Sequence, residues 1–588
     1  MCGIVGMSWK DEKRIRRMSS LIAHRGPDDS GIFSDDAVTL GHRRLSIIDV
    51  SERGHQPMID ENGYAIVFNG EIYNYQEIKD ELTDYHFRTG SDTEVVLAAY
   101  QAWGASCVER FNGMWALCLY DPHERRLFLS RDRFGKKPLY YTMDEGLVFS
   151  SELKALMEVE GCDIDQEAFN ETMTYRFAFG ERTICKGIQS FLPGHSMLYD
   201  LSEKRITSYG PYYTVRIRHY KGSFEQAKRR TYSLVQDAVA KRMVADVPVG
   251  AFLSGGIDSS IVCHCARKHN PDLNTFSIGF DTTNELSFAK LMAERLGTRH
   301  HEFVIDKDSV LEHLDDMVYH MDEPIGADPG FLPIFVLSKE VRKHNKVVLS
   351  GDGADEIFLG YDRYKLFHYG RWLRHFALFD GGNEILKRLR AMRSRDDFSA
   401  FLAITRVFEP RELERMGVAE AYDRRAWDVG GTVMQRMQHF DIMNLLPRDF
   451  FMKADKMSSA FGLEQRCPYM DYRLVEFALS LPRRFKLRGW NEKHVLKEAF
   501  RGEMPREIWE RRKHGFNVPI DYWFEHSLGE RLRGLVGKKN HKLYNTDFAL
   551  ELLEELRTAE GGFKARNIIA QKLWTLLVFE MWYERFVM

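Results

Sequence analysis

Residues 251–260 read AFLSGGIDSS, and this stretch predicts the fold of the larger part of the chain. An apolar strand runs into Ser254-Gly255-Gly256, and a helix is predicted to begin near Asp258. Two glycines after a strand let several backbone N–H groups face one point, and the positive end of the helix adds to them, so the turn can hold phosphate oxygens. The loop has neither the Gly-Lys-Ser/Thr ending of a Walker A loop nor the GxGxxG of dinucleotide folds. The sequence therefore predicts a phosphate-binding turn of another kind, built from Leu253, Ser254, Gly255, Gly256, Asp258 and Ser259.

Strands and helices alternate after this loop. The apolar runs NTFSIGF (274–280) and KVVLS (346–350) alternate with the helical stretches ELSFAKLMAERLG (285–297) and LPIFVLSKEVRKH (332–344). This alternation is typical of an α/β domain with a parallel sheet covered on both faces. Beyond about residue 365 the sequence predicts a mostly helical part.

A second polar loop follows the strand that ends at Ser350. The segment VVLSGDGADEIFLGY (347–361) places several acidic residues, Asp355 among them, just after that strand. In an open parallel sheet, ligands bind beyond the carboxyl ends of the strands. We therefore expect Asp258 and Asp355 to converge on a Mg²⁺ ion that bridges phosphates, because hard cations prefer carboxylate and phosphate oxygens.

The first part of the chain has a different character. Residues 1 to about 200 contain many short strands separated by Gly, Asp and Pro turns, such as YAIVFNGEIYN (64–74), with a few helices between them. A chain of 588 residues is too long for one hydrophobic core. We predict one domain over residues 2–205 and a second over 222–588, with the helical extension starting near 365.

Composition excludes several classes of partner. The hydrophobic content of 44% and the charged content of 29% are ordinary for a globular protein, and a net charge of −3 gives no general attraction to nucleic acid or to anionic membranes. No apolar span reaches about 18 residues. The eight cysteines form no CxxC pair and show no disulfide-like spacing, which suits a reducing compartment. We predict a cytoplasmic protein with no nucleic-acid or membrane partner and with small-molecule substrates.

The chain opens with MCGIVG, which places a thiol at position 2. Initiator methionine is commonly removed when the next side chain is small, so Cys2 could become the N-terminal residue. It would then carry a nucleophilic sulfur and a free α-amine. For an arbitrary protein an incidental cysteine at a frayed end is the simpler interpretation, so the hypothesis depends on the rest of the chain.

Five segments of the first part occur together and in order: MCGIVG (1–6), HRGPDDSG (24–31), GHRRLSIID (41–49), FNGEIYNY (68–75) and TGSDTEV (89–95). They resemble the class II glutamine amidotransferases, whose nucleophile is an N-terminal cysteine. Ser-Gly-Gly-x-Asp-Ser resembles the pyrophosphate loop of the ATP pyrophosphatases. Over nearly its whole length the chain is similar to the glutamine-hydrolysing asparagine synthetases. The resemblance implies an N-terminal Ntn-hydrolase-type αββα sandwich followed by an α/β ATP-pyrophosphatase domain.

The resemblance also implies roles in the first domain. Cys2 would attack the glutamine amide with its own α-amine as base, and Asn69 and Gly70 would stabilise the oxyanion. Arg44 would bind the α-carboxylate, because a guanidinium fits a carboxylate bidentately. The remaining glutamine-binding residues would be Leu45, Ser46, Ile47, Ile48, Asn69, Gly70, Glu71 and Asp92, with Glu71 and Asp92 at the α-ammonium.

In the second domain the resemblance assigns Ile278 to the adenine and adds Ser350 and Gly351 to the ATP-binding residues. The segment from 445 to 482 resembles the long helical signature of the family, with Lys453, Asp455 and Glu464 kept, and Glu464 is taken as catalytic. ERRKHGFNVP (510–519) contributes a catalytic lysine, Lys513, which would face the phosphates. Asp352 and Asp328 are assigned to the acceptor carboxylate.

The implied reaction uses ATP and Mg²⁺. ATP activates a carboxylate as an acyl-adenylate, pyrophosphate leaves, and ammonia from the first domain attacks the acyl carbon. Free ammonia would be protonated in bulk water, so we expect an enclosed and largely apolar passage between the two sites. A homodimer is common in the family, and the sequence alone does not decide the oligomeric state.

The acceptor is the open question, because the match weakens around it. Asp352 stands where the familiar bacterial enzymes often have Glu, and Gly330, Phe331 and Ile334 replace expected small polar residues. The alternatives are therefore L-aspartate and another small carboxylate, such as a uronic acid sugar. A β-lactam-forming relative is disfavoured because it would need no glutaminase site, and an inactive homologue because neither signature is broken.

Overall fold

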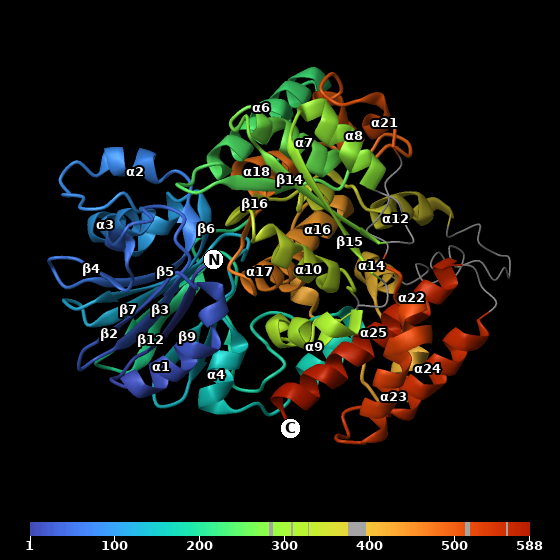
Figure 1. The fold of residues 1–588 in the computed structure, drawn as a ribbon, viewed down its shortest axis with the longest axis horizontal. Coiled ribbons are helices and arrows are strands. Elements are labelled where there is room, and N and C mark those ends of the chain that lie inside the picture. The colour runs from blue at the N-terminus through green and yellow to red at the C-terminus, as the bar shows by residue number, and fades with distance from the viewer. Residues whose placement is uncertain (281–285, 307–309, 327, 374–395, 512–517, 560–562) are drawn as a thin grey trace.

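The computed structural model describes residues 1–280, 286–306, 310–326, 328–373, 396–511, 518–559 and 563–588. It contains a β-sandwich at the N-terminal end, a parallel sheet in the middle of the chain and a helical C-terminal part (Figure 1). The predicted fold class, a sandwich of antiparallel sheets followed by a parallel-sheet domain with many helices, is confirmed.

The sandwich consists of two six-stranded antiparallel sheets. One has the order β10-β8-β9-β1-β3-β2 and the other the order β12-β11-β7-β6-β5-β4. The strands of the first sheet are β1 (Gly3–Met7), β2 (Asp29–Ser34), β3 (Thr39–Arg44), β8 (Tyr140–Met143), β9 (Leu147–Ser150) and β10 (Gln189–Ser190). Those of the second are β4 (Met58–Ile59), β5 (Ala65–Ile72), β6 (Gly113–Asp121), β7 (Arg126–Arg131), β11 (His195–Asp200) and β12 (Arg205–Pro211).

Apolar side chains hold the two sheets face to face. Ile4 and Leu40 of the first sheet and Val67 and Leu129 of the second belong to one buried cluster and are fully inaccessible to solvent. Helices α1 (Glu12–Leu21) and α4 (Leu153–Glu160) cover the first sheet, and α3 (Asp92–Trp103), with α2 (Tyr75–Glu81) beside it, covers the second. The result is a four-layered αββα sandwich that begins one residue after Cys2.

The second sheet system is parallel throughout and has the order β15-β14-β13-β16-β17. Its strands are β13 (Val249–Phe252), β14 (Asn274–Phe280), β15 (Arg299–Ile305), β16 (Val347–Leu349) and β17 (Glu464–Arg466). Leu349 packs in the same cluster as α7 (Ile257–Arg267), whereas Val348 packs with Leu337 of α10 (Phe331–Val341). Because successive strand residues point to opposite faces, both faces are covered, as predicted.

This strand order creates a switch point. The chain moves from β13 outward through β14 to β15, then crosses to β16 and β17 on the other side of β13. The loops after β13 and β16 therefore follow the carboxyl ends of the two neighbouring strands where the strand order reverses, which is where ligands of open α/β sheets bind.

Helices make up most of the remaining structure, and all but α5, which precedes the last three sandwich strands, lie in the second part. They are α5 (Gln166–Tyr175), α6 (Phe224–Arg242), α8 (Leu286–Leu296), α9 (Val310–Met321), α11 (Ala354–Phe358), α12 (Asp362–Leu373), α14 (Asp397–Thr405), α15 (Pro410–Met416), α16 (Val433–Phe440) and α17 (Phe451–Ser459). Further along are α18 (Tyr472–Ser480), α19 (Arg483–Lys486), α20 (His494–Ala499), α21 (Arg506–Trp509), α22 (Ile520–Trp523), α23 (Gly529–Gly537), α24 (Asp547–Thr558) and α25 (Phe563–Phe586). No helix in the described ranges is both long enough and apolar enough to cross a membrane.

Buried charges join the sandwich to α17. Arg25, which is fully buried, donates from Nη1 to Glu152 Oε1 at 2.8 Å and from Nη2 to Asp455 Oδ2 at 2.7 Å. Its Nε also donates to the backbone oxygen of Cys2 at 2.9 Å. Burial on its own lowers the pKa of Arg25, but the two carboxylates raise that pKa above its usual value. The N-terminus is thus tied to the second domain at the junction where Figure 1 marks it.

One sequence expectation is wrong. The cysteine spacing predicted no disulfide, but Cys162 and Cys185 form one, with their Cα atoms 4.9 Å apart. The two residues are 23 positions apart in the sequence. An antiparallel backbone β-bridge between Ile164 and Cys185 brings the flanking segments together. A pairing set by the return of a loop leaves no periodic signal in the sequence, which is why spacing alone missed it.

Candidate functional site

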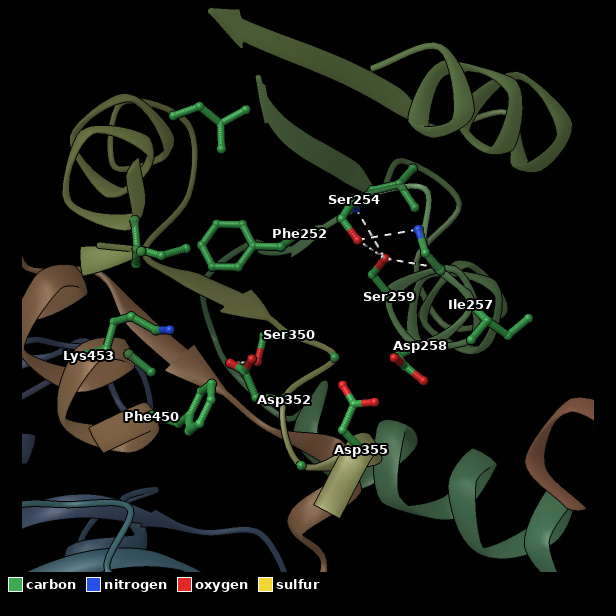
Figure 2. A pocket seen from close by; sticks show the side chains of 18 of the residues that line it. Phe252, Ser254, Ile257, Asp258, Ser259, Ser350, Asp352, Asp355, Phe450 and Lys453 are labelled. Carbon is green, nitrogen blue, oxygen red and sulfur yellow. Dashed lines mark hydrogen bonds between the residues drawn. The ribbon is translucent and has the colours of Figure 1, made fainter. Parts of the chain in front are cut away.

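The main cavity lies at the switch point of the parallel sheet and has a volume of ≈ 550 Å³. Its lining includes residues from all the segments that the sequence singled out in the second domain (Figure 2). The predicted residues that line it are Leu253, Ser254, Gly256, Asp258, Ser259, Ile278, Asp328, Ser350, Gly351, Asp352 and Asp355. Gly255 does not line the cavity. Its backbone oxygen accepts a hydrogen bond at 3.1 Å from Arg511, which does line it.

The loop after β13 is held by its two serines. Ser254 N donates to Ser259 Oγ at 3.1 Å, the two hydroxyl oxygens are 3.0 Å apart, and Gly256 N donates to Ser254 Oγ at 3.3 Å. Gly255 has φ +70°, and a Cβ there would lie 2.6 Å from Ala289 N, so only glycine fits. Helix α7 begins at Ile257, directly after this turn. The local geometry is that of a strand-to-helix turn suited to phosphate oxygens.

Two carboxylates face each other at the edge of the cavity. Asp258, at the start of α7, and Asp355, in α11, point toward one another in Figure 2. Lys493 Nζ bridges them, with an ion pair to Asp258 and a distance of 2.8 Å to Asp355 Oδ1. Lys493 therefore already balances charge on the two predicted metal ligands, and the described residues contain no group of three or more His, Cys, Asp or Glu side chains that could hold a metal ion. The sequence did not predict Lys493, because a single lysine 138 residues after Asp355 belongs to no recognisable motif.

Two further acids at this edge hold protons more tightly than usual. Asp352 is hydrogen-bonded to Ser350 at 2.9 Å and to Gln465 at 2.6 Å, and burial raises its pKa. Burial, with the charge of Asp355, raises the pKa of Glu356 to about 7. Glu356 can therefore exchange a proton near neutral pH, which is where acid–base groups act.

The predicted acceptor end lies next to α17. Lys453 Nζ donates to Asp328 Oδ2 at 2.5 Å, and Gly330 N donates to Asp328 Oδ1 at 2.8 Å. Although burial opposes it, the charge of Lys453 lowers the pKa of Asp328. Gly330 and Ile334, two of the residues that depart from the expected pattern, also line the cavity here.

The sequence predicted two catalytic residues for this part of the chain, Lys513 and Glu464. Lys513 lies outside the described residues. Glu464 is buried in β17, where it pairs with Arg466 at 2.8 Å and Lys137 at 3.8 Å, and it does not line the cavity. Its neighbour Gln465 does, because adjacent residues of a strand point to opposite faces.

The second predicted site surrounds Cys2, which immediately precedes β1. Its thiol lies 3.9 Å from Leu45 O, and burial raises its pKa. Met1 is present and 1% exposed, and burial lowers the pKa of its amino group to about 5. Asn69, in β5 of the facing sheet, is fully buried, and neither atom of its side-chain amide has a hydrogen-bond partner among the described residues. Such a buried, unsatisfied donor is costly unless a ligand completes it.

Residues Arg44 to Ile48 are all buried and leave β3 beside Cys2. Arg44 donates to Ser51 O at 2.8 Å and also to Asp49 O, so backbone oxygens orient its guanidinium. Burial raises the pKa of Asp92 from 3.8 to about 7. Burial also raises the pKa of Glu71, although the positive charge of Arg466, whose Nη2 lies 3.3 Å from Glu71 Oε1, acts in the opposite direction. Burial therefore favours the protonated form of both acids.

A small cavity of ≈ 10 Å³ lies between the two sites. Met1, Lys137 and Asp455 line it, together with Ala454 and Gln465, which also line the main cavity. Part of this lining is charged, unlike the apolar passage that we expected. Lys137 is neutralised locally, since it lies 3.6 Å from Asp455 and 3.8 Å from Glu464. Lys136, which also lines this cavity, donates instead to the backbone oxygens of Gly113 at 3.0 Å and Met470 at 3.4 Å.

Comparison with known proteins matches both parts of the chain to known families. The family model for asparagine synthase matches residues 230–584, and that for the glutamine amidotransferase domain matches residues 1–213. The chain belongs to the asparagine synthase family. It is 33% identical to an asparagine synthetase [glutamine-hydrolyzing] 1 of Bacillus subtilis, over 99% of this chain and 96% of that protein. It is 34% identical to a putative asparagine synthetase [glutamine-hydrolyzing] of Mycobacterium bovis, over 97% and 94% of the two chains.

The buried carboxyl of Asp92 makes folding stability depend on pH. In the folded family member Asp92 keeps its proton up to about pH 7, whereas the unfolded chain releases it near 3.8. The stabilising effect of this proton is full below the unfolded value and is lost as pH rises through the folded value. Asp92→Asn cannot ionise and keeps an acceptor for Ile72 N, which lies 2.9 Å from Asp92 Oδ2. The melting temperature of the variant, measured relative to wild type, should therefore rise between about pH 5 and pH 8.

The matched control is Asp84→Asn, which makes the same change at an exposed position of the same domain. Differential scanning fluorimetry across the pH series measures both variants. A pH-independent difference for Asp92→Asn, or the same trend in both variants, would contradict the raised pKa.

Proposed function

We propose that the protein makes L-asparagine from L-aspartate, ATP and glutamine-derived ammonia, through a β-aspartyl-adenylate. It is a carbon–nitrogen ligase with glutamine as the amido donor. The observation that carries the proposal is a shared wall. Ala454 and Gln465 line both the main cavity, called the nucleotide-type cavity below, and the small cavity that Met1 lines. This arrangement suits a reaction in which one site makes ammonia and the other consumes it.

In the first domain, Cys2 is the proposed nucleophile. Removal of Met1 frees the α-amine, which accepts the thiol proton as the sulfur attacks the glutamine amide carbon. The unsatisfied amide of Asn69, with Gly70 N, donates to the oxyanion. Arg44 holds the α-carboxylate, and Glu71 and Asp92 hold the α-ammonium by releasing their protons. Collapse of the oxyanion expels ammonia and leaves a thioester that water hydrolyses.

In the second domain, the turn from Ser254 to Ser259 holds the pyrophosphate part of ATP, and Ile278 contacts the base. Asp258 and Asp355 would hold Mg²⁺, which neutralises phosphate charge when bound. Lys493 supplies a fixed positive charge at the same edge, where negative charge grows on the departing pyrophosphate. Asp352, with its raised pKa, is placed to accept a proton from the attacking ammonia.

A second acceptor remains open, and one observation favours it. Gly330 and Ile334 line the cavity beside the Asp328–Lys453 pair, which puts an apolar surface where the α-amino and α-carboxyl groups of aspartate need polar partners. Another small carboxylate, such as a uronic acid sugar, would then be amidated by the same chemistry.

The acceptor is tested by pyrophosphate release with ATP, Mg²⁺ and glutamine, with and without L-aspartate. We expect aspartate to increase pyrophosphate release at least tenfold and asparagine to form in equal amount. Glutamine hydrolysis without stimulation by aspartate would point to the other carboxylate. No turnover of either kind would contradict the proposed function as a whole.

Replacement of the thiol separates the two sites. Cys2→Ala still permits removal of Met1 but has no nucleophile, so glutamine-driven product should fall at least a thousandfold. Product formed from added ammonium should stay within about twofold of wild type, because the second site is untouched. Amide formation measured with each nitrogen source checks this, and equal loss of both would contradict separate sites.

Obstruction of the shared wall should uncouple them. Ala454 is 7% exposed and lines both cavities, so Ala454→Leu adds bulk where ammonia must pass. We expect the ratio of product to hydrolysed glutamine to fall at least threefold while ammonium-driven product is kept. Ala454→Gly, which removes bulk at the same place, should keep the wild-type ratio. An unchanged ratio in Ala454→Leu would mean that ammonia takes another route.

A further inference from the structure

A second large cavity lies away from both proposed sites. Its volume is ≈ 920 Å³, and its wall is formed by α12, the start of α16, the segment from Ser480 to Lys486 and the residues at 219–220. It shares no lining residue with the nucleotide-type cavity. The volume falls within the range of small-molecule sites in proteins.

The charged groups on this wall are all basic. His219, His368, Arg436, Arg483 and Lys486 line it, and no Asp or Glu is among its described lining residues. Arg436 approaches a carboxylate only at the limit of an ion pair, 4.0 Å from Asp397, and its buried Nε has no hydrogen-bond partner within the described ranges. Arg483 forms no ion pair with any described residue, and its charge contributes to lowering the pKa of His368. Among the described lining residues, the wall therefore carries basic groups and no carboxylate to balance them.

Lys486 is the most unusual of these residues. It is 1% exposed, and its Nζ donates to Gln438 Oε1 at 2.6 Å and to Ala478 O at 2.8 Å, both of them neutral acceptors. Burial lowers the pKa of Lys486 to about 7, and no carboxylate among the described residues offsets this. Buried ammonium groups in proteins are normally paired with an acid, so this one is incomplete.

The rest of the wall combines neutral polar side chains, among them Thr432 and Gln435, with a group of apolar ones. Phe367, Val433, Met434, Leu481 and Pro482 face the same cavity. A bare inorganic ion would leave these side chains uncovered, whereas a neutral apolar molecule would leave the cations unpaired. The complementary ligand has both an anionic group and an apolar body.

The cavity also has a physical connection to the nucleotide-type site. Gln438, whose Oε1 accepts from Lys486, donates from Nε2 to the backbone oxygens of Glu356 and Ile357, each at 2.8 Å. Both belong to α11, which carries Asp355 and Glu356 into the main cavity. A ligand that moves Lys486 therefore acts on α11 through one fully buried side chain.

We propose that this cavity is a regulatory site for a small organic anion, a carboxylate or phosphate on an apolar body, coupled through Lys486 and Gln438 to helix α11. The binding step is independent of the proposed function. The coupling step needs only that ATP binds at the main cavity, not that aspartate is the acceptor.

Binding is tested with 8-anilinonaphthalene-1-sulfonate, a fluorescent aromatic anion, titrated into the full-length chain with saturating ATP to occupy the main cavity. We expect one site per chain. Arg483→Glu should weaken binding at least tenfold, because it places a negative charge on the wall. The matched control is Arg484→Glu, the same change at the exposed neighbour that does not line the cavity, and it should stay within twofold.

Two further measurements guard against trivial explanations. Arg436→Gln, a milder change, should weaken binding of the probe at least threefold and provides a test if Arg483→Glu does not fold. N-phenyl-1-naphthylamine, which lacks the sulfonate, should bind wild type and Arg483→Glu equally. Equal binding of the anion by the Arg483 and Arg484 variants, or an equal loss of the neutral probe, would overturn the proposal of an anion site.

Coupling is tested by the dissociation constant of ATP with and without the sulfonate probe. Linkage requires that each ligand changes the affinity of the other by the same factor, and we expect at least fivefold in wild type. Gln438→Met keeps the size of the side chain but removes its hydrogen bonds, so the probe should still bind while the factor falls below twofold. An unchanged ATP affinity in wild type would overturn the coupling and leave the proposed function untouched.

Discussion

The buried contact between Arg25 and α17 is the constraint on which the two-site arrangement depends. Arg25 binds Asp455 of α17, Glu152 of the sandwich and the backbone of Cys2 at the same time. Removing such charges from water costs several kcal/mol per ion, which is recovered only when every partner is in place. The network therefore tolerates one relative placement of the two domains. That placement puts Ala454, next to Asp455, in the wall that both cavities share.

The small cavity beside this wall is partly lined by charged side chains, so the passage that we propose for ammonia is not purely apolar. Ammonia needs protection from bulk water more than it needs an apolar tube, and buried charges that are already neutralised by one another do not readily donate a proton. Lys137 is held by Asp455 and Glu464 in this way. Glu464 thus fits a role in the junction better than one at the phosphates. Its neighbour Gln465 faces the opposite side of β17 and holds Asp352 at 2.6 Å. One short strand therefore serves both sites.

The main cavity and the second large cavity, which we propose as a regulatory site, differ in what determines their position. The main cavity sits where the strand order reverses, so its position follows from topology. The second cavity lies among helices for which the sequence contains no binding motif. Its character depends on a buried lysine that has two neutral acceptors and no acidic partner among the described residues. Gln438 connects the two cavities because its side-chain amide has a donor and an acceptor. Its Nε2 donates to the backbone oxygen of Glu356, which lines the main cavity, and its Oε1 accepts from Lys486, which lines the second.

Local chemistry was readable from the sequence by itself: a phosphate turn needs adjacent glycines after a strand, and a cysteine at position 2 needs its own amine. The alternation of apolar strands and helices predicted the parallel sheet, and the polar loops after two of its strands predicted much of the cavity lining, because such patterns act over a few residues. The sandwich was an expectation implied by the resemblance of the five N-terminal segments. Tertiary structure alone brought Lys493 between Asp258 and Asp355, paired Cys162 with Cys185, and moved Glu464 away from the nucleotide-type cavity. Each of these depends on contacts between distant segments, whose geometry is set by packing and by the strand face on which a side chain falls, and neither is encoded in local spacing.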